Sequence, residues 1–153
     1  MKNIFLTKNS KQTKKLGELL AKEVVKSHPI KEAFVFGLKG DLGGGKTTFL
    51  QGFARGLGLK DKITSPTFVI LKKFKVGNQK LGYFVHIDCY RIRKVKEILS
   101  LGLKEIMSDP KNIVAIEWAE KIKKILPEHT IWIEFDFINK NTRKIVVKFK
   151  NDK

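Results

Sequence analysis

One stretch of nine residues combines glycines, a lysine and threonines at a spacing that suits phosphate binding. It covers residues 40–48 and fits the pattern G-x-x-x-x-G-K-[ST]. Glycines let the backbone wrap closely around phosphate oxygens, so that its N–H groups can donate to them. Lys46 adds a positive charge for the β- and γ-phosphates, and Thr47 offers a hydroxyl to Mg²⁺. The stretch therefore predicts a phosphate-binding loop.

The flanking sequence favours this interpretation over a plain glycine-rich turn beside a lysine. Residues 33–38 are apolar and predict a short buried strand, and residues 47–57 predict a helix with one apolar side. Strand, glycine-rich loop and helix are the context that such a loop requires. Gly52 and Gly56 lie four residues apart on one face of this helix, so we expect them to pack closely against the sheet.

A phosphate loop also needs an acidic residue for Mg²⁺ at the end of a neighbouring strand. Glu117 follows the apolar run 113–116, and Asp88 ends the predicted strand 80–88. We expect Glu117 to bind Mg²⁺ or to position water, and Asp88 to act in the same site. The alternative for each is an ordinary carboxylate paired with Arg91 or a lysine. His86 shares a face with Asp88 at period two and is predicted to be a packed strand residue.

Thr67 lies on the segment between the loop helix and the next strand. In GTPases, a switch segment that is ordered by the γ-phosphate and Mg²⁺ occupies this place. Thr67 is therefore a candidate catalytic residue. The alternative is a simple turn that begins a strand.

The chain of 153 residues is expected to form one α/β domain over residues 1–153. Antiparallel hairpins are expected at 68–88 and 130–149. Ser10 is predicted to cap a helix that runs to about residue 27. Further short helices are expected at 94–101, closed by Gly102, and at 119–126. Residues 4–6 predict an edge strand.

The composition limits the classes of protein to which this chain can belong. No apolar run approaches the roughly 20 residues of a membrane span. Cys89 is the single cysteine, so disulfides within the chain and thiolate zinc clusters are excluded. These features predict a cytoplasmic protein. The net charge of +17 arises from 32 basic and 15 acidic residues, but the lysines are spread along the chain. The charge pattern therefore favours nonspecific binding of nucleic acid at low salt over specific recognition.

Four motifs together resemble one family, the small bacterial ATPase TsaE, also called YjeE. They are the loop at 40–48, Ser65-Pro66-Thr67-Phe68, His86-Ile87-Asp88-Cys89-Tyr90-Arg91 and Ile116-Glu117-Trp118. The resemblance runs from about Gly17 to Pro127. Gly44 departs from the family, which often has alanine there, and the lysine excess is not a family feature.

The resemblance implies a P-loop NTPase-like fold with a mixed, mostly parallel central sheet flanked by helices. It also implies ATP as cofactor and slow hydrolysis that partners stimulate. It implies that Thr47 and Glu117 hold Mg²⁺, that Asp88 lies near the phosphates, and that Ser10 lies near the base. It also implies that the phosphates are wrapped by Leu42, Gly43, Gly44, Gly45, Lys46, Thr47 and Thr48. The implied role is in threonylcarbamoyladenosine modification of tRNA. The implied partners are the threonylcarbamoyl-transferase subunit (TsaD) and its inactive paralogue (TsaB), with direct contact to tRNA left open.

Two other classes remain as alternatives. A small-molecule kinase shares the phosphate loop but usually adds an arginine-rich lid, and this chain has four arginines with no such insertion. A non-catalytic nucleotide- or RNA-binding module would rely on charge, and its affinity for tRNA would fall steeply with salt.

Overall fold

The computed structural model describes residues 2–27, 31–41, 45–64, 70–78 and 80–149. Within these residues, one seven-stranded sheet has the order β1-β7-β6-β2-β5-β4-β3. The elements, in chain order, are β1 (Lys2–Thr7), α1 (Ser10–Lys26), β2 (Phe34–Gly40), α2 (Lys46–Gly56), β3 (Leu71–Lys75), β4 (Tyr83–Asp88), α3 (Val95–Leu99), α4 (Leu103–Ser108), β5 (Ile113–Glu117), the 3₁₀ helix η1 (Ala119–Ile125), β6 (Ile131–Phe137) and β7 (Arg143–Lys148).

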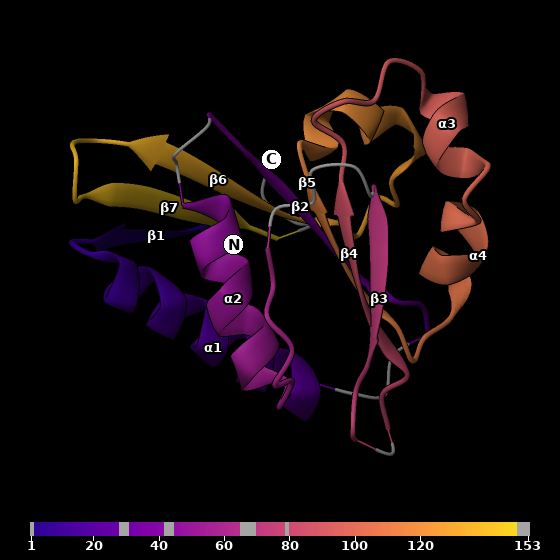
Figure 1. Ribbon diagram of the computed structural model, residues 1–153, viewed down its shortest axis with the longest axis horizontal. Coiled ribbons are helices and arrows are strands. Elements are labelled where there is room, and N and C mark those ends of the chain that lie inside the picture. The colour runs from indigo at the N-terminus through magenta and orange to yellow at the C-terminus, as the bar shows by residue number, and fades with distance from the viewer. Residues whose placement is uncertain (1, 28–30, 42–44, 65–69, 79, 150–153) are drawn as a thin grey trace.

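The sheet has the predicted mixed character. Its four central strands, β6, β2, β5 and β4, run parallel to one another. The outer pairs β3–β4, β6–β7 and β1–β7 are antiparallel, so both predicted hairpins and the predicted edge strand are confirmed. Helices cover both faces (Figure 1), with α1 and α2 on one side and α3 and α4 on the other.

Two apolar clusters fill the spaces between these layers. The first joins α1 and α2 to the sheet through phenylalanines of α2, β2 and β4, including Phe49, Phe36 and Phe84. The second joins α3, α4 and η1 to the opposite face, through Ile98, Leu103 and other residues. Alternate residues of β4 and β5 enter opposite clusters, because side chains of a strand point alternately to the two faces.

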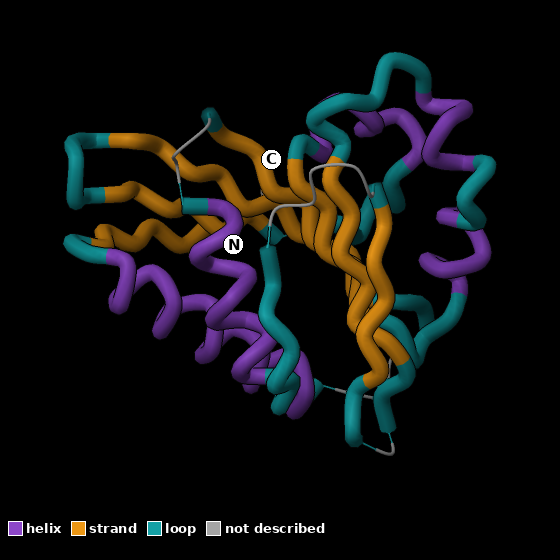
Figure 2. Tube along the Cα trace, viewed as in Figure 1, coloured by secondary structure: helices purple, strands orange, loops and turns teal. Residues whose placement is uncertain are grey.

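Gly52 and Gly56 do not pack against the sheet, so that prediction was wrong. A Cβ on Gly52 would lie 1.8 Å from the carbonyl oxygen of Lys14, and one on Gly56 would lie 2.4 Å from that of Glu18. Gly17 approaches α2 in the same way, with the carbonyl oxygen of Phe49 at 2.1 Å from such a Cβ. The glycines therefore let α1 and α2 pack backbone to backbone, as the chain trace shows in outline (Figure 2).

Several local predictions need correction. Asn9, not Ser10, caps α1, because the Asn9 side chain accepts a hydrogen bond from the N–H of Gln12 at 2.8 Å. The helix expected at 94–101 is α3, which ends ahead of a left-handed Gly102 (φ 85°), but α4, which begins directly after this glycine, was missed in the sequence. The segment after Trp118 is a 3₁₀ helix that is irregular at Ile122.

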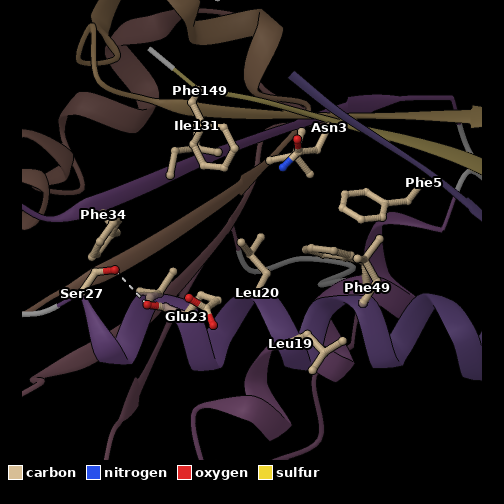
Figure 3. Close-up of a pocket in the computed structure, with 13 residues that line it drawn as sticks. Asn3, Phe5, Leu19, Leu20, Glu23, Ser27, Phe34, Phe49, Ile131 and Phe149 are labelled. Atoms are coloured by element: carbon tan, nitrogen blue, oxygen red, sulfur yellow. Dashed lines mark hydrogen bonds between the residues drawn. The ribbon is translucent and has the colours of Figure 1, made fainter. Parts of the chain in front are cut away.

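An apolar pocket of about 440 Å³ lies between α1 and the strands β1, β2, β6 and β7 (Figure 3). Leu16, Leu20, Phe34 and Phe149 are among the side chains that line it. Its lining, as far as the structure describes it, includes none of the predicted site residues. In the same described part of the chain, no helix combines the length and apolar character needed to cross a membrane.

Candidate phosphate and magnesium site

The predicted site lies where parallel strands end and α2 begins. Strand β2 leads into the glycine-rich loop, and α2 follows it directly. Strand β5 pairs with β2 on one side and with β4 on the other, so that Glu117 is level with both Leu38 and Asp88. In open α/β sheets this edge, at the carboxyl ends of the strands, is the usual place for ligands.

Lys46 is 5% exposed and is the first residue of α2. Its ammonium group donates to the carbonyl oxygens of Gly40 and, at 3.1 Å, of Asp41. The same nitrogen lies 4.3 Å from the centre of the Trp118 ring, within range of a cation–π contact. Burial lowers the pKa of Lys46, while the charge of Glu117 raises it in part. A positive charge is therefore held inside the site by carbonyls and a ring.

The start of α2 offers backbone donors beside this charge. Gly45 takes a left-handed conformation (φ 99°) and caps α2 without a side-chain hydrogen bond. Thr47 and Thr48 lie in the first turn, both half-buried. The first N–H groups of a helix and its dipole favour an anion at this end. Gly45, Thr47 and Thr48 therefore lie where backbone donors are available, and their role as phosphate contacts stays a prediction.

Thr47 and Glu117 come together although they are 70 positions apart in the chain. Thr47 Oγ1 lies 3.4 Å from Glu117 Oε1. The second carboxylate oxygen, Oε2, lies 2.7 Å from Nε2 of His86. Glu117 and His86 are 3% and 1% exposed. His86 is therefore a packed strand residue, as predicted, but its polar contact is to Glu117.

Asp88 lies beside Glu117 on the neighbouring strand and is 9% exposed. Its Oδ1 accepts a hydrogen bond from the backbone N–H of Tyr90 at 2.9 Å. The negative charges of Glu117 and Asp88 both act on Lys46. The structure thus brings Lys46, Thr47, Asp88 and Glu117 to one place, as the sequence predicted.

Other predicted residues stand apart from this group or lie outside the described residues. Leu42, Gly43, Gly44 and Thr67 are outside them. Ser10 begins α1, and one turn later Thr13 approaches the loop. A Cβ built on Gly45 would lie 3.6 Å from Cγ2 of Thr13 and 3.7 Å from Cγ of Arg143.

Thr13 and Arg143 are neighbours of the phosphate loop that were not predicted from the sequence. Thr13 is 2% exposed and forms a 2.7 Å hydrogen bond to Thr7, which joins the end of β1 to the first turns of α1. The sequence signal that could have indicated Thr13 was a threonine about one turn into a predicted helix. Nothing local in the sequence indicated that β7 brings Arg143 to this end of α2.

A protein-family model matches most of the chain. The model described as "Threonylcarbamoyl adenosine biosynthesis protein TsaE" covers residues 7–145. The chain belongs to the TsaE family. The family model matches residues on both sides of the span 17–127, over which the sequence motifs resembled the family. Its match reaches into β7.

Curated relatives named "tRNA threonylcarbamoyladenosine biosynthesis protein TsaE" support the assignment. The TsaE of Bacillus subtilis is 36% identical over 139 residues, which are 91% of this chain and 80% of that protein. The TsaE of Haemophilus influenzae is 32% identical over 123 residues, 80% of this chain and 75% of that protein. The crystal structure of Bacillus subtilis YdiB aligns with a TM-score of 0.74 at 31% identity, covering 99% of this chain and 87% of that one. The fold is therefore the predicted P-loop NTPase-like one.

The oxygens of Thr47 and Glu117 are of a kind that fits Mg²⁺. Among the described residues, no group of three or more His, Cys, Asp or Glu side chains could hold a metal ion. Mg²⁺ does not need such a group, because it keeps several waters and uses one or two protein oxygens together with substrate phosphates. The hydroxyl of Thr47 and the carboxylate of Glu117, 3.4 Å apart, are oxygens of this kind.

Proposed function

We propose that this chain binds ATP with Mg²⁺ and hydrolyses it as a subunit of the machinery that makes threonylcarbamoyladenosine in tRNA. The observation that carries the proposal is the meeting of Lys46, Thr47 and Glu117 at the start of α2. Family membership supports the link to tRNA modification, because the relatives are named for that process. We place the activity in the cytoplasm, with tRNA as the eventual substrate of the complex.

Each side chain has a distinct task in the proposed site. Lys46 binds the β- and γ-phosphates, and the first N–H groups of α2 donate to phosphate oxygens. Thr47 and Glu117 hold Mg²⁺, which supplies a Lewis acid that neutralises charge on the phosphates. Asp88 lies at the same level as Glu117 and adds a second carboxylate for positioning water. Thr67 and residues 42–44 complete the site in the proposal.

Hydrolysis forms a bond from a water oxygen to the γ-phosphorus and breaks the bond to the bridging oxygen of ADP. The protein contributes position and charge, not covalent chemistry. A positive charge near the γ-phosphate during transfer is often supplied by a partner protein. We therefore expect slow hydrolysis by the isolated chain and faster hydrolysis with TsaD and TsaB.

A reconstituted modification reaction tests this function. The mixture contains TsaD, TsaB, a threonylcarbamoyl donor, ATP and unmodified substrate tRNA, and the modified nucleoside is measured by mass spectrometry after digestion. Repeated turnover should require this chain and should be lost with Thr47→Ala. Equal turnover with Thr47→Ala, or with the chain left out, would refute the proposal. Transfer of phosphate to an added metabolite would instead indicate a kinase.

A further inference from the structure

His86 and Glu117 form a buried polar pair on the sheet face that α2 covers. Nε2 of His86 lies 2.7 Å from Oε2 of Glu117, and both side chains are almost fully buried. The other carboxylate oxygen, Oε1, faces Thr47 at 3.4 Å. One carboxylate thus connects a strand histidine to the threonine at the start of α2.

The parallel register of β4 and β5 makes this contact possible. His86 lies opposite Ala115, and Glu117 is the next residue of β5 on the same face. The imidazole therefore reaches Glu117 diagonally across the two strands. Asp88 lies directly opposite Glu117, but its Oδ1 is bound by the backbone N–H of Tyr90. The two carboxylates of the site are therefore oriented by different donors.

The direction of the hydrogen bond follows from the chemistry of the two groups. An ionised carboxylate only accepts hydrogen bonds, so Nε2 of His86 must carry the hydrogen. A buried carboxylate needs such a donor, since an unsatisfied charged oxygen away from water is strongly disfavoured. The bond also fixes rotation of the carboxylate about its last side-chain torsion. With Oε2 held by His86, Oε1 is turned toward Thr47.

We propose that His86 is a positioning residue for the magnesium site. Its Nε2–H holds Oε2 of Glu117 and so presents Oε1, next to Thr47 Oγ1, to Mg²⁺. The inference rests on the proposed function, because it assigns His86 a task at that site. Partners that orient metal-binding carboxylates typically matter 10–100-fold for metal affinity or activity.

Substitutions of His86 separate the hydrogen bond from simple packing. His86→Leu introduces an apolar side chain that fills much of the same space but donates no hydrogen bond. His86→Gln can place an amide N–H close to the position of Nε2, whereas the amide of His86→Asn is too short to reach Glu117. His129→Leu is the matched control, because His129 contacts the carbonyl oxygen of Ala33, near the opposite end of β2.

The measurement is magnesium affinity, not turnover. Each folded variant is first saturated with an ATP analogue that has a β,γ-imido bridge, and Mg²⁺ is then titrated into the complex by calorimetry. We expect His86→Leu and His86→Asn to weaken Mg²⁺ binding about 10–100-fold. His86→Gln should stay within about threefold of the wild type, and binding of the analogue in EDTA should not change in any variant.

The possible outcomes distinguish a failure of the positioning role of His86 from a failure of the proposed function. Magnesium affinity unchanged in His86→Leu, or an equal loss in His86→Gln and His86→Leu, would overturn the positioning role. If His86→Leu does not fold, His86→Asn takes its place, and an equal loss of magnesium affinity in His86→Gln and His86→Asn would overturn the positioning role. A wild-type chain that binds the analogue with no effect of Mg²⁺ would overturn the proposed function, and the inference would fall with it.

Discussion

Lys46 is the residue whose environment says most about the site. It is a buried cation next to two buried carboxylates, Glu117 and Asp88, and its ammonium is held by loop carbonyls. Burial lowers the pKa of Lys46, and the carboxylates offset part of that effect. A polyphosphate would bring more negative charge to the same ammonium, so binding should keep Lys46 charged.

Replacing Lys46 with alanine should therefore remove nucleotide binding and hydrolysis together. Lys46→Ala eliminates the charge that would contact the β- and γ-phosphates, and we expect hydrolysis to fall to background and ADP affinity to drop at least about tenfold. Calorimetry with ADP and a phosphate-release assay check both. Lys73→Ala on β3 removes an equal charge away from the site and serves as the control. Full activity of Lys46→Ala would contradict the assignment.

Residue types and spacing predicted Lys46, Thr47, Asp88 and Glu117, because each motif is local in the sequence. The contacts of Trp118 and His86 could not be predicted in this way. Trp118 has a positive φ of 58°, rare for a residue with a side chain, and its ring lies against the Lys46 ammonium. His86 meets Glu117 only because β4 pairs with β5 in one register. No short segment of sequence contains that information.

At the scale of elements, the backbone contact between α1 and α2 sets how the phosphate-loop helix lies on the molecule. Three glycines permit it, and Gly52 is the tightest, because a Cβ at that position would lie 1.8 Å from the carbonyl oxygen of Lys14. The spacing of Gly52 and Gly56 indicated a close approach. The sequence could not predict whether these glycines would face another helix or the sheet, because close packing against either one requires a residue without a side chain.

Gly52→Ala should lower the free energy of unfolding by about 2 kcal/mol. The steric cost of placing a Cβ against α1 exceeds the roughly 1 kcal/mol by which alanine favours a helix over glycine. Chemical denaturation measures the free energy of unfolding. Gly77→Ala is the control, since a Cβ there meets nothing within 4 Å. An increase in stability for Gly52→Ala would show that the two helices are not packed this closely.

Glu134 on β6 joins three strands through two lysines. It lies 3.4 Å from Lys39 Nζ on β2 and 2.5 Å from Lys148 Nζ on β7. Burial raises the pKa of the Glu134 carboxyl, but the hydrogen bond from Lys148 and the charge of Lys39 outweigh it, so the pKa is lowered from its ordinary 4.5. The ionised form is therefore favoured in the folded state, and its contribution is lost as the pH falls through the lowered pKa.

Glu134→Gln should lower the free energy of unfolding near neutral pH by about 0.5–1 kcal/mol, as expected for partly exposed ion pairs. The difference from the wild type should be complete above pH 4.5, the ordinary pKa, and should shrink as the pH falls below it. Thermal unfolding followed across this range checks the trend. A difference that stays constant into strong acid would rule out the ion pairs as its source.

At the scale of the whole molecule, the order of strands assembles the site. Strands β2, β5 and β4 are separate in the chain, yet adjacent in the sheet, and they deliver the loop, Glu117 and Asp88 to one edge. The hairpins were predicted from strand patterns and turns, and the mostly parallel centre of the sheet from the resemblance of the motifs to a family. The full strand order, with β7 between β1 and β6, depends on long-range pairing that periodicity does not reveal.

Hydrolysis of ATP by the wild type and by Glu117→Ala, each alone and with TsaD and TsaB, tests the central claim most directly. Loss of the carboxylate removes the proposed magnesium ligand beside Thr47. We predict slow release of phosphate by the wild type alone, a clear increase with the partners, and loss of both with Glu117→Ala. Wild-type rates in Glu117→Ala, or bound ATP that is never hydrolysed in any mixture, would contradict the account.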